Sequence, residues 1–166
     1  NSRILIAANS LDDAVECKNL LAELADFVYV SSDPDSAVTD FEDVRPAILI
    51  LAFRDLAATD SYYLRLYCRS KFAQGHSHRT IILRTEDEEN IAAALCRKNH
   101  FNFSARYWSQ PADSMHLAMA IDQAEMDIRD SSEIFDMRRK MESHIDHIIQ
   151  LEREKFTGSG HAESDI

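Results

Sequence analysis

Short apolar runs alternate with longer polar segments along residues 3–125 of the chain. Five of these runs are rich in β-branched or aromatic side chains and therefore predict β-strands. They comprise residues 3–7, 27–32, 47–53, 80–85 and 104–109. The run AILILAF at 47–53 contains no polar residue, which indicates a strand that is buried on both faces.

The segments between these runs have the period of helices. One face of the first helix is marked by Val15, Leu20, Leu21 and Leu24, and Asp12 or Asp13 is placed to cap its start. Further helices are predicted from Asp33-Pro34, over 61–72 and from residue 86, with loops at 54–60 and 73–78. Alternating strands and helices predict an α/β fold with a doubly wound, five-stranded parallel sheet. In such sheets ligands bind beyond the carboxyl ends of the strands, so functional residues are expected at that edge.

A long helix is predicted at the C-terminal end, because neither Gly nor Pro occurs between Pro111 and Gly158. Its first part carries apolar residues that can pack on the sheet: Leu117, Ala120, Ile121, Ala124 and Ile128. We therefore divide the chain into a 1–125 α/β domain, a 126–156 helix continuous with the last domain helix, and a small, polar 157–166 segment with the composition of a flexible linker or tail.

The second part of this helix carries a heptad repeat. Ile134, Met141, Ile148 and Lys155 occupy successive a positions, and Met137, His144 and Leu151 occupy d positions. This stripe predicts a parallel two-stranded coiled coil and hence a homodimer through the C-terminal helix. Two alternatives stay open: the helix folds back on its own domain, or it is ordered by another partner. His144 and His147 are interpreted as a seam residue and a surface residue.

Composition narrows the possible functions. The net charge of −11 disfavours nucleic acid and anionic membranes as partners. No apolar run reaches the ~20 residues of a membrane-spanning helix, and no signal peptide is visible. Cys17, Cys68 and Cys96 are widely spaced, which is typical of reduced, mostly buried cysteines in the cytoplasm. No Gly-rich phosphate loop, GxSxG or HExxH motif occurs, and we expect no cofactor, no metal and no enzymatic activity.

Three strand ends resemble one known family. RILIAANS, PAILILAF and ARYWSQP are similar to the first, third and fifth strands of the receiver domain of bacterial two-component response regulators. The last of these matches the family pattern at Ala105, Tyr107 and Pro111. The resemblance covers residues 3–125 and implies the receiver fold.

The family's chemical residues are absent from the matching positions. Its acidic pair, phosphorylated Asp, switch Ser/Thr and Lys fall on Ala8 and Asn9, on Ala52, on Thr85 (or Arg84) and on Gln110. Aspartyl phosphorylation needs a carboxylate nucleophile, Mg²⁺ held by further carboxylates, and a cation near the phosphoryl group. None of these groups is available, so the resemblance implies a degenerate phosphorylation site.

These observations predict a pseudo-receiver: a phosphorylation-independent regulatory and dimerisation module of a bacterial signalling protein. Its C-terminal helix would pass a protein or ligand input to a downstream output domain. Tyr107 and Trp108 are candidate interface residues of the domain, because the resembled family commonly pairs through this region. Tyr63 and Tyr67 share a helical face that is either a partner anchor or partly buried against the sheet.

Two other functions remain possible from the sequence. The first is a flavodoxin-like domain, or an enzyme, that binds a small molecule at the same edge through Asn9, Asp55, Thr85 and Gln110. The second is an atypical phosphoreceiver that uses Asp55 as its acceptor, because Asp55 follows Ala52 by three residues.

Overall fold

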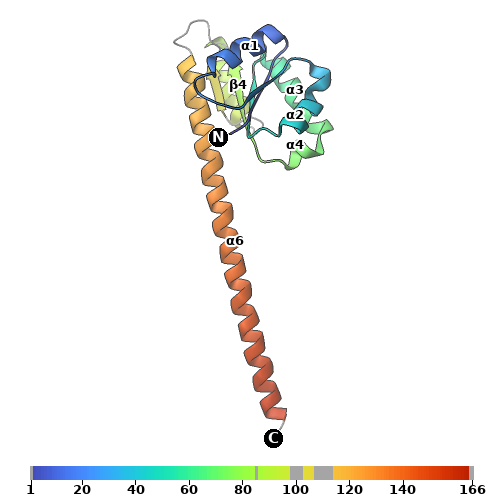
Figure 1. Cartoon of the computed structure of the whole chain (residues 1–166), viewed down its shortest axis with the longest axis vertical. Coiled ribbons are helices and arrows are strands. Elements are labelled where there is room, and N and C mark those ends of the chain that lie inside the picture. Colours follow the sequence, from blue (N-terminus) through green and yellow to red (C-terminus); the bar gives the residue numbers. More distant parts are fainter. Residues whose placement is uncertain (1, 85, 98–102, 107–113, 165–166) are drawn as a thin grey trace. The chain divides into compact units, whose positions relative to one another are not determined.

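The computed structural model describes residues 2–84, 86–97, 103–106 and 114–164. The chain divides into two compact units, residues 1–128 and residues 129–166. The first unit contains a sheet whose strands run parallel in the order β2-β1-β3-β4-β5 (Figure 1). The strands are β1 (Ile4–Ala7), β2 (Val28–Ser31), β3 (Ile48–Leu51), β4 (Arg79–Arg84) and β5 (Phe103–Arg106). The predicted α/β class with a parallel sheet is confirmed, and the strand order is that of a doubly wound fold.

Helices follow the strands along the chain. They are α1 (Leu11–Leu20), the short 3-10 helix η1 (Pro34–Ser36), α2 (Ala37–Val44), α3 (Leu56–Arg69), α4 (Lys71–Gly75), η2 (Glu86–Glu88), α5 (Glu89–Arg97) and α6 (Ser114–Ser164). Asp33 caps η1, as its place before Pro34 predicts, with its carboxylate accepting from the Asp35 N–H at 3.0 Å.

Two apolar cores lie on opposite faces of the sheet, because successive side chains of a strand point to opposite sides. Ile4 and Ile6 of β1 belong to one core with α1 and the first part of α6. Leu5 and Ala7 belong to the other core with α2, α3, α4 and Ala92 of α5. Figure 1 shows α2, α3 and α4 together on one side of the strands. All four residues of β3 are fully buried, as the uninterrupted apolar run predicts.

The first part of α6 packs on the sheet as predicted. Leu117, Ala120, Ile121 and Ala124 are buried in the core with α1, and Ile128 packs against it. Asp127 adds an ion pair to the start of β4, where Arg79 Nε lies 2.7 Å from the Asp127 carboxylate.

The predicted packing of α1 is wrong in two respects. Ser10 is the N-cap, and its Oγ accepts from the Asp13 N–H at 3.2 Å, so the aspartates lie in the first turn. Of the residues predicted for its apolar face, Leu21 is fully buried and Leu20 is half-buried, whereas Val15 and Leu24 are exposed. The small residues Ala14 and Cys17 are fully buried with Leu21, and a search for large apolar side chains does not select them.

The predicted loops at 54–60 and 73–78 are also wrong in part. α3 begins at Leu56, because Asp55 caps it by accepting from the Ala57 N–H at 3.0 Å. α4 extends to Gly75 after a cap by Ser70, whose Oγ accepts from the Ala73 N–H at 3.1 Å. A single capping side chain thus starts each helix at a position where composition indicates a loop.

α6 continues to Ser164, beyond the predicted end at Phe156. The flexibility expected for 157–166 stays a prediction. β5 ends at Arg106, and residues 107–109 of the predicted fifth strand lie outside the described part of the chain.

Candidate functional site

The carboxyl edge of the central strands contains two buried alanines, at two of the positions that the sequence predicts to form a degenerate phosphorylation site. Ala8 and Ala52 directly follow β1 and β3, and their side chains belong to the apolar core that α1 and α6 cover. They are only 2% and 1% exposed. Backbone hydrogen bonds fix both residues: the Ala8 N–H donates to Ser31 O at 3.0 Å and the Ala52 N–H to Ala7 O at 2.7 Å. Two of the three positions at which the resemblance predicts carboxylates, Ala8 and Ala52, are therefore part of a packed hydrophobic core, whereas Asn9 is exposed.

The donor set at this edge does not suit Mg²⁺. Hard divalent cations require several oxygen ligands, preferably carboxylates. Ala8 and Ala52 offer no side-chain ligand, and Asn9 offers one neutral oxygen. Among the described residues, no group of three or more His, Cys, Asp or Glu side chains is placed to hold a metal ion.

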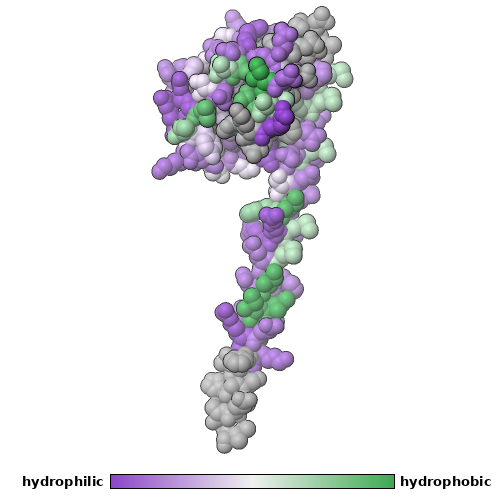
Figure 2. All heavy atoms as spheres, turned by 180° about the vertical axis from the view of Figure 1, so that it is seen from behind, coloured by the Kyte–Doolittle hydropathy of each residue, from purple (hydrophilic) through white to green (hydrophobic). Residues whose placement is uncertain are grey.

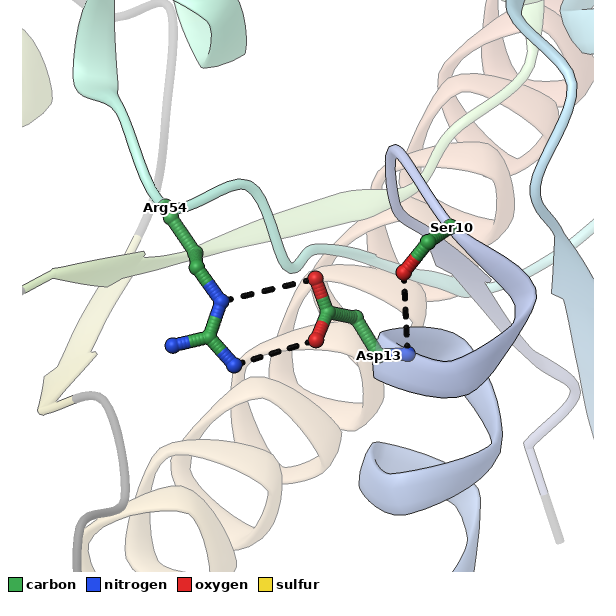
Figure 3. A network of polar contacts seen from close by, with 3 residues as sticks. All are labelled: Ser10, Asp13 and Arg54. Atoms are coloured by element: carbon green, nitrogen blue, oxygen red, sulfur yellow. Dashed lines mark hydrogen bonds and ion pairs between the residues drawn. The ribbon is translucent and has the colours of Figure 1, made fainter.

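An ion pair absent from the sequence prediction joins the loop after β3 to α1 (Figure 3). Arg54 Nη2 lies 3.0 Å from Asp13 Oδ1, and Arg54 Nε lies 3.5 Å from Asp13 Oδ2. The Asp13 N–H also donates to Ser10, so the first turn of α1 is fixed from two sides. Asp13, one of the two acids in the first turn of α1, is thus paired with a cation of the protein itself. Sequence spacing gave no signal for this pair, because its members are 41 residues apart.

Asp55, the alternative phosphoacceptor, has a structural role. Its side chain is exposed and accepts from the Ala57 N–H as the cap of α3. The neighbouring Leu56 N–H donates to the Glu88 carboxylate at 3.4 Å. Two backbone donors in the first turn of α3, the Leu56 and Ala57 N–H groups, are therefore satisfied by carboxylates, as the positive end of a helix favours.

The structure does not place Asn9 and Asp55, two of the four predicted ligands, in one cavity. Asn9 lines a cavity of about 160 Å³ together with Phe53 and Tyr62, whereas Asp55 is not among its lining residues. Thr85, Gln110, Tyr107 and Trp108 lie outside the described residues.

The second half of α6 exposes the predicted apolar stripe. Figure 2 shows hydrophobic side chains gathered in patches along this helix. The a and d residues Ile134, Met137, Met141, Ile148 and Leu151 are all exposed, and so are Phe135, Ile145 and Ile149 beside them. His144 at its d position is exposed as well. A set of exposed apolar residues this large on one helix is typical of a surface that another helix covers.

The tyrosines of α3 and the cysteines are only partly as predicted. Tyr63 and Tyr67 share a face, with stacked rings 6.2 Å apart, which confirms the predicted shared helical face.

Cys17 is fully buried, and burial raises the pKa of its thiol to about 12. Cys68 is exposed and so is not the core residue expected from the sequence, because it lies on the outer face of α3. Cys96 is half-buried, and burial raises its pKa.

Comparisons with known proteins identify the fold. No family model matches the chain, and no curated protein does. A response regulator from Desulfuromonas acetoxidans is 14% identical, with a TM-score of 0.55 over 75% of this chain and 96% of that one. NtrX from Brucella abortus is 13% identical, with a TM-score of 0.59 over 80% of this chain and 29% of that one. The chain therefore has the fold of response-regulator receiver domains.

A further similar structure contains the yeast Spc42 trimeric coiled coil in a fusion. It is 13% identical, with a TM-score of 0.58 over 89% of this chain and 97% of that one. Within the described part of the chain, no helix combines the length and the apolar character needed to span a membrane.

Proposed function

We propose that the chain is a phosphorylation-independent regulatory module, a pseudo-receiver, that assembles through its C-terminal helix. The observation that carries the proposal is the pairing of a receiver fold with buried alanines at the positions of the carboxylates. A core methyl group can neither attack a phosphoryl donor nor bind Mg²⁺. On this proposal the protein is not an enzyme, and its input is a contact with a protein or a small ligand.

The exposed stripe of α6 supports the assembly part of the proposal. An isolated helix that holds Ile134, Met141 and Ile148 in water gains nothing from them, whereas a paired helix buries them. Isoleucine at a positions and leucine at a d position favour two parallel strands. The module is thus a homodimer whose helix leads into a downstream output domain, and we place the protein in the cytoplasm of a bacterium.

Sedimentation equilibrium tests this assembly. The full chain is expected to have twice the monomer mass at micromolar concentration, and a truncation that ends at Ile128 is expected to be a monomer. Ile128 is the appropriate end because residues 1–128 form a compact unit that includes the Arg79–Asp127 ion pair. A dimeric truncation would instead assign pairing to the domain, with Tyr107 and Trp108 as the residues to substitute. A full chain of three times the monomer mass would replace the dimer by a trimer.

A further inference from the structure

The exposed apolar stripe of α6 is flanked on both sides by residues at fixed heptad positions. The g positions, each directly before an a residue, hold Glu133, Lys140 and His147. The e positions, each directly after a d residue, hold Arg138, Ile145 and Glu152. All of these side chains are exposed and belong to the 129–166 unit. They lie beside the seam when such a helix pairs with another, and in that place they decide which helix it accepts.

A parallel pair of α6 helices brings opposite charges together at one of these contacts. In a parallel, in-register coiled coil each g residue lies opposite the e residue five positions later in the other helix. Glu133 therefore meets Arg138 of a second copy, and by symmetry Arg138 meets the second copy's Glu133. The pairing of two identical helices thus creates two carboxylate–guanidinium contacts, which are strong and directional for an ion pair.

The other two g–e contacts of a parallel pair are free of repulsion. Lys140 meets Ile145 of the second copy, and the aliphatic stem of the lysine can cover that apolar side chain. His147 meets Glu152, whose carboxylate can accept a hydrogen bond from an imidazole N–H. No g–e contact of the parallel register joins like charges, although charged residues occur in almost every turn of 129–155.

The charged groups beside the seam are available to a second helix. Glu133, Arg138 and Glu152 make no ion pair within the part of the chain that the structure describes. Arg138 lies four residues before Glu142, a spacing that permits an ion pair on one helix, but no such pair occurs between these two described residues. The guanidinium of Arg138 can therefore turn to a partner without breaking an existing contact.

The same positions disfavour an antiparallel pair. In that arrangement g residues face g residues and e residues face e residues, on opposite sides of the seam. Glu133 and Arg138 of two antiparallel copies therefore do not meet, and their attraction is lost. The charges favour the same parallel arrangement as the apolar stripe.

We propose that Glu133 and Arg138 form a recognition pair through which α6 selects a second copy of this chain, parallel and in register. This inference rests on the proposed assembly through α6 and adds what the partner must carry: a cation opposite Glu133 and a carboxylate opposite Arg138. A helix with a similar apolar stripe but like charges at these two places is rejected by repulsion. The apolar stripe thus supplies affinity, and the recognition pair supplies the choice of partner.

Single charge reversals in the full chain test the recognition pair by sedimentation equilibrium. In a Glu133→Arg dimer both contacts become Arg–Arg, and in an Arg138→Glu dimer both become Glu–Glu. Each variant should raise the dimer Kd about tenfold, because two attractive contacts become two repulsive ones. The effect should shrink in about 1 M NaCl, which a loss of apolar packing would not do. The double variant Glu133→Arg/Arg138→Glu recreates the attraction with reversed signs and should restore the wild-type Kd.

Two matched controls make the same chemical changes away from the seam. Glu142→Arg lies at the outer b position and Arg139→Glu at the outer f position, and both native side chains are exposed. Each control should leave the Kd within about twofold, because an outer position does not face the second helix.

A mixture of the two single variants tests partner choice directly. Glu133→Arg presents two cations and Arg138→Glu presents two carboxylates, so only the mixed dimer has attractive contacts. Native mass spectrometry of an equimolar mixture, with one variant ¹⁵N-labelled, should show mostly the mixed dimer. A statistical mixture of the three dimers, or equal effects of Glu133→Arg and Glu142→Arg on a dimeric protein, overturns the recognition pair alone. A monomeric wild type overturns the proposed assembly as well, so the two failures are distinguished.

Discussion

The methyl groups of Ala8 and Ala52 define the chemistry of this sheet edge. Both are packed in the core between the sheet, α1 and α6, and the backbone at each position is hydrogen-bonded to a neighbouring strand. A carboxylate placed there would lose its hydration without gaining a cation, because Arg54 in the following loop is paired with Asp13. On the proposed function, one substitution is therefore not expected to create a phosphorylation site at this edge.

Ala52→Asp is expected to destabilise the protein by about 3 kcal/mol at pH 7, since it buries an unpaired charge. Ala52→Asn adds nearly the same volume without the charge and should cost less. The gap between the two variants, measured by urea unfolding, should narrow towards pH 4 as the new carboxylate is protonated. Equal stability of both variants at pH 7, or labelling of Ala52→Asp by acetyl phosphate with Mg²⁺, would contradict the buried-core account.

His78 predicts a pH dependence of stability. Burial lowers the pKa of its imidazole from 6.5, and the charges of His76 and Arg79 lower it further, although the hydrogen bond to the His76 carbonyl opposes the shift. Its Nδ1 donates to that carbonyl at 2.8 Å, and its Nε2 lies 3.4 Å from the Tyr63 hydroxyl. Below pH 6.5 the unfolded chain binds a proton that the folded chain does not, so stability falls as the pH falls.

The His78→Asn variant isolates this effect, because its side-chain amide can replace the Nδ1–H donor but cannot titrate. Urea unfolding at pH 7.5 and at pH 5.5 should show a larger loss of stability in the wild type than in the variant. Parallel losses in the two proteins would show that His78 does not contribute to the pH dependence.

At the scale of elements, short side-chain caps decide where helices begin. Asp55 shows this most clearly, because its carboxylate starts α3 directly after the edge of the sheet. Asp55→Ala should destabilise the domain by about 1 kcal/mol, and Asp55→Asn by much less, because asparagine caps equally well. Both variants should be as inert to acetyl phosphate as the wild type. Labelling of the wild type that Asp55→Ala abolishes would establish Asp55 as a phosphoacceptor and refute the pseudo-receiver.

The positions of the strands could be predicted from the sequence, whereas most contacts at the carboxyl edge of the sheet could not, for physical reasons. An apolar run such as 47–53 indicates burial on both faces wherever it occurs, so β3 needed only local information. The contact face of α1 was predicted only in part, because Leu21 is buried as expected but the small residues Ala14 and Cys17 complete the face in place of Val15 and Leu24. The Arg54–Asp13 ion pair and the cavity lined by Asn9, Phe53 and Tyr62 are formed by residues that lie far apart in the sequence. No local sequence pattern predicts such contacts.

At the scale of the whole molecule, the two units have opposite surface character. The 1–128 unit has two buried apolar cores besides the apolar residues on its surface, whereas every large apolar residue described in 129–155 of α6 is exposed. Burial of one large aliphatic side chain contributes about 1.5–3 kcal/mol, so several of them can stabilise a two-helix assembly. Assembly through α6 is thus the central claim of the proposed function.

The most direct test compares Ile148→Lys with Ile149→Lys in the full chain by sedimentation equilibrium. The two residues are of one type, adjacent and each 42% exposed, but Ile148 lies at an a position and Ile149 at the outer b position. Ile148→Lys should weaken the dimer by more than about tenfold, since it places two like charges in the seam, and Ile149→Lys should leave it nearly unchanged. A monomeric wild type, or equal effects of the two substitutions, would contradict the coiled coil.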